Sequence, residues 1–189
     1  QGQQSAEDLT ATETTASSAA AAGGPLVAID AGHQAKGNSD TEPIGPGAAE
    51  KKAKVAGGTK GCVSGWYEYQ LTLAVAEKLA AELETRGYTV LMVRTSHDVN
   101  ISNAERALIA NDAGADAFVR IHANGSTSES AHGAETLCQT AANPYNGALY
   151  EQSRRLSEKV LDGLAEAAGA KRRGVVETDA MSGINWCQV

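Results

Sequence analysis

Two histidines and one glutamate stand at positions where their side chains could hold a catalytic metal ion. His33 follows the apolar run Leu26–Ile29 and a glycine turn, so we expect it at the carboxyl end of a buried strand. His122 ends a second strand-like run, Ala117–Ile121, and Glu68 lies at the expected start of a long helix. In open α/β sheets the carboxyl ends of the strands form the edge at which ligands bind. Because two histidines and a carboxylate are a common zinc ligand set, the pattern indicates a catalytic metal.

Spacing alone also fits a simpler interpretation. His33 and Glu68 are 35 residues apart and Glu68 and His122 are 54 apart, which matches no local metal motif. The histidines could be ordinary strand-end residues, and a helix dipole favours a first-turn glutamate without any metal. Without further evidence this interpretation is the stronger one.

Six other side chains could contribute to the site or only to the fold. His97 and His132 lie in polar loops with no identifiable partner, and we expect both to be exposed. Trp66 and Tyr67 precede Glu68 and could form an aromatic wall for a sugar or peptide or could anchor a loop. For the arginines that end a strand or lie on a helix, Arg94 and Arg106, we expect a structural role as hydrogen-bond donors to loops.

Composition limits the class of protein. A chain of 189 residues suits one domain, and its formal net charge of −7 argues against nucleic acid as a partner. No apolar stretch has the length of a membrane span, and the chain begins at Gln1, as a mature or trimmed form without its export signal would. The cysteines lack Cys-x-x-Cys spacing, so one disulfide with a free thiol and three thiols both remain open for Cys62, Cys138 and Cys187. Oligomeric state is left open.

The pattern along the chain predicts an α/β fold. Residues 1–24 are low in apolar content and are expected to be a flexible linker, with a helical pro-segment on Ala19–Ala22 as the alternative. From residue 25 onward strands and helices alternate, which favours a single domain with a mostly parallel sheet and helices on both faces. We expect strands at 26–30, 89–93, 116–122, 133–139, 175–176 and 186–189, and helices at 69–86, 102–112 and 149–168. Apolar residues at four-residue spacing, Leu71 to Leu83, predict the buried face of the first helix. Residues 34–67 show little periodicity and read as a long loop that shapes the site entrance.

Several segments in order resemble one family of bacterial cell-wall hydrolases. The matching segments are Ile29–His33, Glu68 with Leu71–Ala76, Gly87–Val90 running into Arg94-Thr95, Asn103–Arg106 with Ala110-Asn111, Ala115–Asn124 and Gly133–Thr136. Over roughly 160 residues this order is similar to the zinc-dependent N-acetylmuramoyl-L-alanine amidases of the amidase-3 class.

The resemblance implies a function and a site. His33, Glu68 and His122 correspond to the family's zinc ligands, and the reaction would be hydrolysis of the amide between N-acetylmuramic acid and L-alanine in peptidoglycan. Asn124 and Glu135 are candidates for substrate contacts; a turn-stabilising role for Asn124 is equally open. A secreted or cell-envelope location in a bacterium follows from such a substrate.

Two departures from the family pattern qualify these expectations. The 34–67 segment is longer than in compact members. The family's catalytic glutamate lies on a late strand in a Pro-apolar-apolar-apolar-x-Glu pattern that no residue matches here, so we expect it, with a last strand and helix, beyond Val189. An amidase-like module that binds zinc and peptidoglycan without catalysis is therefore the alternative, and a zinc peptidase that acts on another amide is a third.

Overall fold

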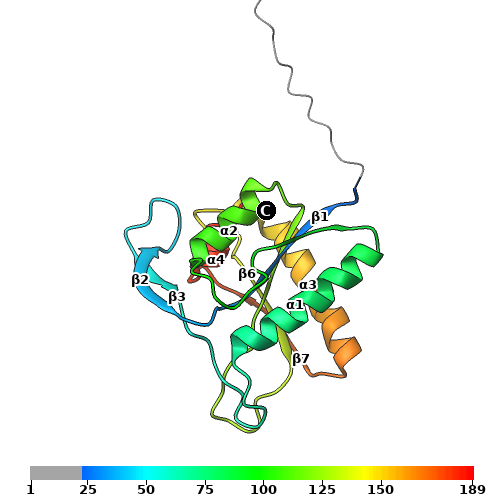
Figure 1. The fold of residues 1–189 in the computed structure, drawn as a ribbon. Coiled ribbons are helices and arrows are strands. Elements are labelled where there is room, and N and C mark those ends of the chain that lie inside the picture. The colour runs from blue at the N-terminus through cyan, green and yellow to red at the C-terminus, as the bar shows by residue number, and fades with distance from the viewer. Residues whose placement is uncertain (1–22) are drawn as a thin grey trace, which may run out of the picture.

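The computed structural model describes residues 23–189, and its centre is a parallel three-stranded sheet (Figure 1). The strand order is β4 (Thr89–Met92), β1 (Leu26–Ala31) and β5 (Ala117–Ile121). β1 lies in the middle and is buried along almost its whole length, as expected for an apolar strand with neighbours on both sides. The register pairs Ala31 with Ile121, so the segments that follow β1 and β5 leave the sheet at the same edge.

Helices and a second strand pair surround this sheet. α1 (Glu68–Thr85) packs on the sheet and runs across the front of the molecule in Figure 1, and α3 (Tyr150–Ala168) lies behind it. α3 covers the parallel pair β6 (Ala134–Cys138) and β7 (Arg172–Glu177) after the short turn η1 (Gly147–Leu149). α2 (Asn103–Asp112) contacts the one-turn helix α4 (Ser182–Asn185). The α/β class with parallel strands and helices agrees with the sequence-based expectation.

The core lies between β1 and α1. Its buried members are Val27, Ile29, Ala31, Leu73 and Ala76. Small residues such as Ala76 let the helix backbone come close to the strand. The expected helix face was partly wrong, because Leu71 and Val75 are each 42% exposed while Thr72 and Leu73 point inward.

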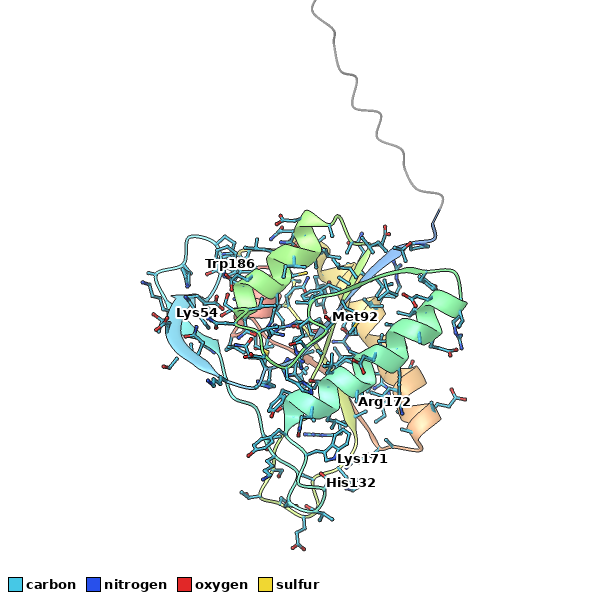
Figure 2. The ribbon with its side chains drawn as sticks, viewed as in Figure 1. Lys54, Met92, His132, Lys171, Arg172 and Trp186 are labelled. Atoms are coloured by element: carbon cyan, nitrogen blue, oxygen red, sulfur yellow. The ribbon has the colours of Figure 1, made fainter. Side chains whose placement is uncertain are left out.

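Residues 34–67 are not the featureless loop that the sequence predicted. They contain an antiparallel ribbon of β2 (Asn38–Pro43) and β3 (Lys51–Val55), which stands at one side of the molecule. Lys54 marks this ribbon in Figure 2. Both strands are mostly polar and largely exposed, and neither shows along its whole length the apolar alternation that identifies a half-buried strand.

The strand expected at 186–189 was also wrong. Trp186 is the C-terminal cap of α4, and its indole Nε1 donates to the Pro43 carbonyl at 2.9 Å (Figure 2). The Asn111 side chain donates to the Trp186 carbonyl and accepts from the Gln188 N–H, at 2.9 and 2.8 Å. These hydrogen bonds connect residues 186–188 to α2 and to β2 through side chains, and the segment does not pair as a strand.

Three further expectations concern the linker, the cysteines and the possibility of a membrane-spanning helix. The linker expected at 1–24 falls, except for Gly23 and Gly24, outside the described residues. Cys62, Cys138 and Cys187 are all free thiols. None of the helices between residues 23 and 189 combines the length and the apolar character that crossing a membrane requires.

Candidate metal centre

Three separate elements bring His33, Glu68 and His122 to the carboxyl edge of the sheet. The Gly32 N–H donates to the Ile121 carbonyl at 2.9 Å, which extends the β1–β5 pairing to the residues directly before both histidines. Glu68 is the first residue of α1, and its N–H donates to the Thr59 carbonyl at 2.8 Å. The parallel strands therefore deliver the histidines and the helix start delivers the carboxylate, as the positions in the sequence predicted.

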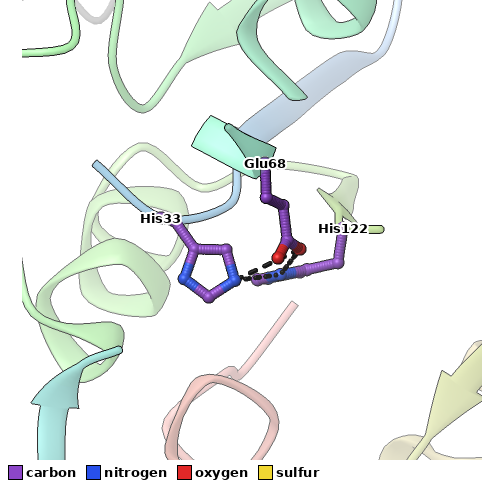
Figure 3. Close-up of side chains that lie close together, drawn as sticks. All are labelled: His33, Glu68 and His122. Atoms are coloured by element: carbon purple, nitrogen blue, oxygen red, sulfur yellow. Dashed lines mark hydrogen bonds and ion pairs between the residues drawn. The ribbon is translucent and has the colours of Figure 1, made fainter. Parts of the chain in front are cut away.

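The three side chains converge on one point (Figure 3). His33 Nε2 and His122 Nδ1 lie 3.1 Å apart, and each lies 3.2 Å from Glu68 Oε1. Glu68 is almost fully buried, whereas the side chain of His122 is 38% exposed. The group is thus held by the protein on one side and open to solvent on the other.

The spacing of these atoms fits a small divalent cation. A tetrahedral zinc ion bound at about 2.0–2.1 Å separates its ligand atoms by roughly 3.3–3.4 Å. The observed separations of 3.1 to 3.2 Å are close to that value. Two imidazoles and one carboxylate are also donors that zinc prefers, and three protein ligands leave a fourth position open.

Backbone groups of the loop before α1 orient two of these side chains. His33 Nδ1 lies 2.8 Å from the Ala56 carbonyl. Because a carbonyl only accepts, Nδ1 carries the proton, and the lone pair of Nε2 faces the other ligand atoms. The Thr59 N–H donates to Glu68 Oε2 at 3.0 Å, and the Ala123 N–H donates to Oε1 at 2.8 Å. The long segment before α1 is therefore part of the site, through backbone groups that sequence patterns do not identify.

The electrostatics favour a charged carboxylate at Glu68 and shift the pKa values of the two imidazoles in opposite directions. Burial opposes ionisation of Glu68, but hydrogen bonds from His122, His33 and the backbone hold its pKa far below the usual range. Burial lowers the pKa of His122. For His33 burial acts in the same direction, but the hydrogen bonds to Glu68 and Ala56 outweigh it and raise the pKa. One negative charge with two neutral nitrogen donors is the state that binds a cation.

Asn124 and Glu135 lie outside this triangle and bind each other. Asn124 Nδ2 donates to Glu135 Oε1 at 2.7 Å, and Glu135 Oε2 accepts from Arg173 at 3.1 Å. Asn124 follows His122 by two residues in the chain, so the pair is close in sequence to one of the candidate ligands.

The aromatic side chains before Glu68 are exposed. Trp66 and Tyr67 are exposed, and Tyr67 stacks on Tyr69 with ring centroids 5.5 Å apart.

The other two histidines lie outside the triangle. His97 is not the isolated residue that the sequence suggested, because its ring packs edge-on against Tyr69, with ring centroids 5.2 Å apart. Together with Trp66 it lines a small cavity of about 250 Å³ on the flank of α1. His132 lies apart in a polar loop, with Nδ1 at 2.8 Å from the Ser130 carbonyl (Figure 2).

Comparison with known proteins finds similarity between this chain and N-acetylmuramoyl-L-alanine amidases. The model of the Amidase_3 family, described as N-acetylmuramoyl-L-alanine amidase, matches residues 27–189. The chain is 32% identical over 152 residues to N-acetylmuramoyl-L-alanine amidase LytC of Bacillus subtilis, which covers 80% of this chain and 25% of that protein. It is 32% identical over 134 residues to AmiA of Salmonella typhimurium, which covers 71% of this chain and 38% of that one. The chain thus spans between a quarter and two fifths of the length of these relatives.

A solved structure gives the same result for the fold. The crystal structure of the N-acetylmuramyl-L-alanine amidase Ami1 from Mycobacterium smegmatis superposes with a TM-score of 0.76 at 25% identity. The match covers 88% of this chain and 78% of that one.

Proposed function

The chain belongs to the Amidase_3 family of N-acetylmuramoyl-L-alanine amidases, and we propose that it cleaves peptidoglycan with a zinc ion held by His33, Glu68 and His122. The observation that carries the proposal is the triangle of ligand atoms 3.1 to 3.2 Å apart at the carboxyl edge of the sheet. The bond cut is the amide between the lactyl group of N-acetylmuramic acid and L-alanine. Residues 25–189 would belong to the domain that carries this activity.

The chain's own groups prepare the site in three ways. His33 Nε2, His122 Nδ1 and Glu68 Oε1 would hold the ion, and the Ala56 carbonyl places the proton of neutral His33 on Nδ1, so that Nε2 is the donor atom. Zinc, when bound, supplies Lewis-acid chemistry, because it polarises a carbonyl oxygen and lowers the pKa of a water molecule. The exposed side of His122 is the side from which the amide would enter. Asn124 and Glu135 would contact the substrate.

The reaction consumes one water molecule. The C–N bond of the amide breaks, the hydroxyl joins the lactyl carbonyl carbon, and the proton goes to the leaving nitrogen. The products are a glycan with a free lactyl carboxylate and a stem peptide with a free L-alanine amine. Since this substrate lies in the bacterial cell wall, we infer a secreted or cell-envelope location.

One observation supports an alternative in which the domain binds zinc and peptidoglycan without cutting. Among residues 23–189, Glu68 is the one carboxylate that hydrogen-bonds to His33 or His122. A second carboxylate that serves as general base typically contributes 10²- to 10⁴-fold in rate. Without such a group the same site would hold a ligand and turn it over slowly.

Mass spectrometry of peptidoglycan fragments separates the two functions. Purified fragments are incubated with the zinc-loaded protein, with His122→Ala, and with His132→Ala as a matched histidine control in a polar loop. The amidase proposal predicts free stem peptides from the wild type and from His132→Ala, and none from His122→Ala. Intact fragments from a wild type that holds zinc and sediments with peptidoglycan would favour the binding module.

A further inference from the structure

The backbone at His33 adopts a conformation that residues with a side chain rarely take. Its φ is 62°, and His33 is the one non-glycine residue with positive φ in the range 23–189. The left-handed region is sterically unfavourable for a residue with a Cβ atom. Contacts from the surrounding structure must offset that cost if the turn is to persist.

The side chain that meets this turn is Arg106 of α2, which is completely buried. A guanidinium group carries five N–H donors in one plane, and here every donor has an acceptor. The acceptors are Ile101 O at 3.1 Å from Nε, Asp30 Oδ1 at 2.6 Å and Ala31 O at 3.1 Å from Nη1, and His33 O at 3.1 Å and Gln34 Oε1 at 2.9 Å from Nη2.

These hydrogen bonds lie on both sides of the turn that carries the candidate ligand His33. Four of the five acceptors belong to residues 30–34, on both sides of Gly32. One rigid planar group therefore fixes the end of β1 and the peptide that follows His33. Arg106 forms its bond to the carbonyl of His33 and not to the imidazole, so its effect on the ring passes through the backbone.

Arg106 is itself held firmly. Its charge is balanced by the fully buried Asp30, whose other oxygen accepts from Arg120 Nε at 2.8 Å. At the start of α2 the Ser102 hydroxyl accepts from the Glu105 N–H at 3.2 Å, and the Ser102 N–H donates to the Glu105 carboxylate at 2.7 Å. The helix and the ion pair thus fix both ends of the side chain.

Arg94, the second buried arginine near this turn, contacts a different set of residues. Arg94 donates to the carbonyls of Ala31, Gly32 and Tyr69, at 2.7, 3.2 and 2.7 Å. Its contacts stop before His33. The hydrogen bond to the carbonyl of His33 itself, the residue in the left-handed conformation, comes from Arg106.

We propose that Arg106 is a positioning residue for the metal centre, which holds His33 in its left-handed turn so that Nε2 meets Glu68 and His122. This inference rests on the proposed zinc site and adds a role for a residue that touches neither metal nor substrate. A lysine cannot replace it, because an ammonium has three donors around one atom and lacks the planar fork.

The test is the Arg106→Lys variant, compared with the wild type and with Leu161→Ala. Leu161 is fully buried in α3, away from residues 30–34, so its truncation lowers stability without altering the turn. Zinc affinity is measured by competition with a chelator at a temperature where every variant is folded, and cobalt-substituted proteins give visible spectra that report ligand geometry. We expect about 10- to 100-fold weaker zinc binding and an altered cobalt spectrum for Arg106→Lys, and wild-type values for Leu161→Ala.

Three other results of these measurements would contradict the proposal. Wild-type zinc affinity in Arg106→Lys would refute the positioning role. An equal loss in Leu161→Ala would assign the effect to general stability. A wild type that binds no zinc would remove the metal site and this inference with it. If Arg106→Lys does not fold, Gln34→Met removes one of the two acceptors of Nη2, and it should still weaken zinc binding, to a smaller extent.

Discussion

Gly32 provides a way to displace one ligand without changing any ligand residue. A Cβ atom built at Gly32 would lie 2.4 Å from Cε1, 2.5 Å from Nε2 and 2.6 Å from Nδ1 of the His122 ring. The backbone of Gly32 is outside the left-handed region, so alanine is allowed there by conformation alone. The substitution Gly32→Ala therefore acts through the ring of His122.

The size of the effect follows from these distances. Ordinary contact begins at 3.4 Å, and 3.4 minus 2.4 leaves about 1.0 Å by which the ring must move. Metal–ligand distances tolerate deviations of only about 0.2 Å. His122 should then leave the ligand set, and we expect zinc affinity to fall by roughly 100-fold or more, beyond the loss of an outer hydrogen-bond partner.

The assay is a chelator competition for zinc, with circular dichroism to establish that each variant is folded. Gly57→Ala is a matched control, since it lies in the loop beside His33 and a Cβ there has nothing within 4 Å. We expect the control to bind zinc as the wild type does. Unchanged zinc affinity in folded Gly32→Ala would refute the assignment of His122 as a ligand.

Three further predictions concern stability. Leu161→Ala removes a fully buried side chain of α3 and should lower the free energy of unfolding in urea by about 2–3 kcal/mol; a loss below about 1 kcal/mol would contradict its place in the core. Gly163→Ala, in the same helix with open space around its Cβ, should raise that free energy by about 0.5–1 kcal/mol and raise Tm; a lower Tm would show a contact that the structure lacks. Burial opposes ionisation of Asp30, but Arg120 and Arg106 hold its pKa below the ordinary 3.8, so its stabilising effect is present above about pH 4 and is lost as the pH falls further. Acid titration of unfolding should therefore be less steep for Asp30→Asn, and an identical slope would count against the buried ion pair.

The strand and helix pattern, together with the family resemblance, predicted that His33, Glu68 and His122 come together. His33 and His122 each follow an apolar run, and parallel strands end at one sheet edge, so their proximity follows from the α/β pattern. Glu68 joined them because the start of α1, expected at residue 69, lies at residue 68. Ser102 and Glu105 form a capping box at the start of α2, and their Ser-x-x-Glu spacing is typical of that motif.

The remaining features depend on contacts that no local pattern encodes. β2 is polar along its length, and β3 alternates polar and apolar residues only over its last four positions, so neither strand was recognised. The roles of Ala56 and Thr59 rest on backbone groups, which are the same for every residue type. Trp186 was expected to begin a strand, but its position is set by Asn111 and the Pro43 carbonyl, both distant in sequence.

The most direct test of the central claim is the zinc content of the purified protein after dialysis, measured by mass spectrometry of the metal for the wild type and for His122→Ala. A site made of His33, Glu68 and His122 predicts one zinc ion per wild-type chain and almost none in a folded His122→Ala variant. One zinc ion per chain in both proteins would contradict the account, because the metal would then be held somewhere else.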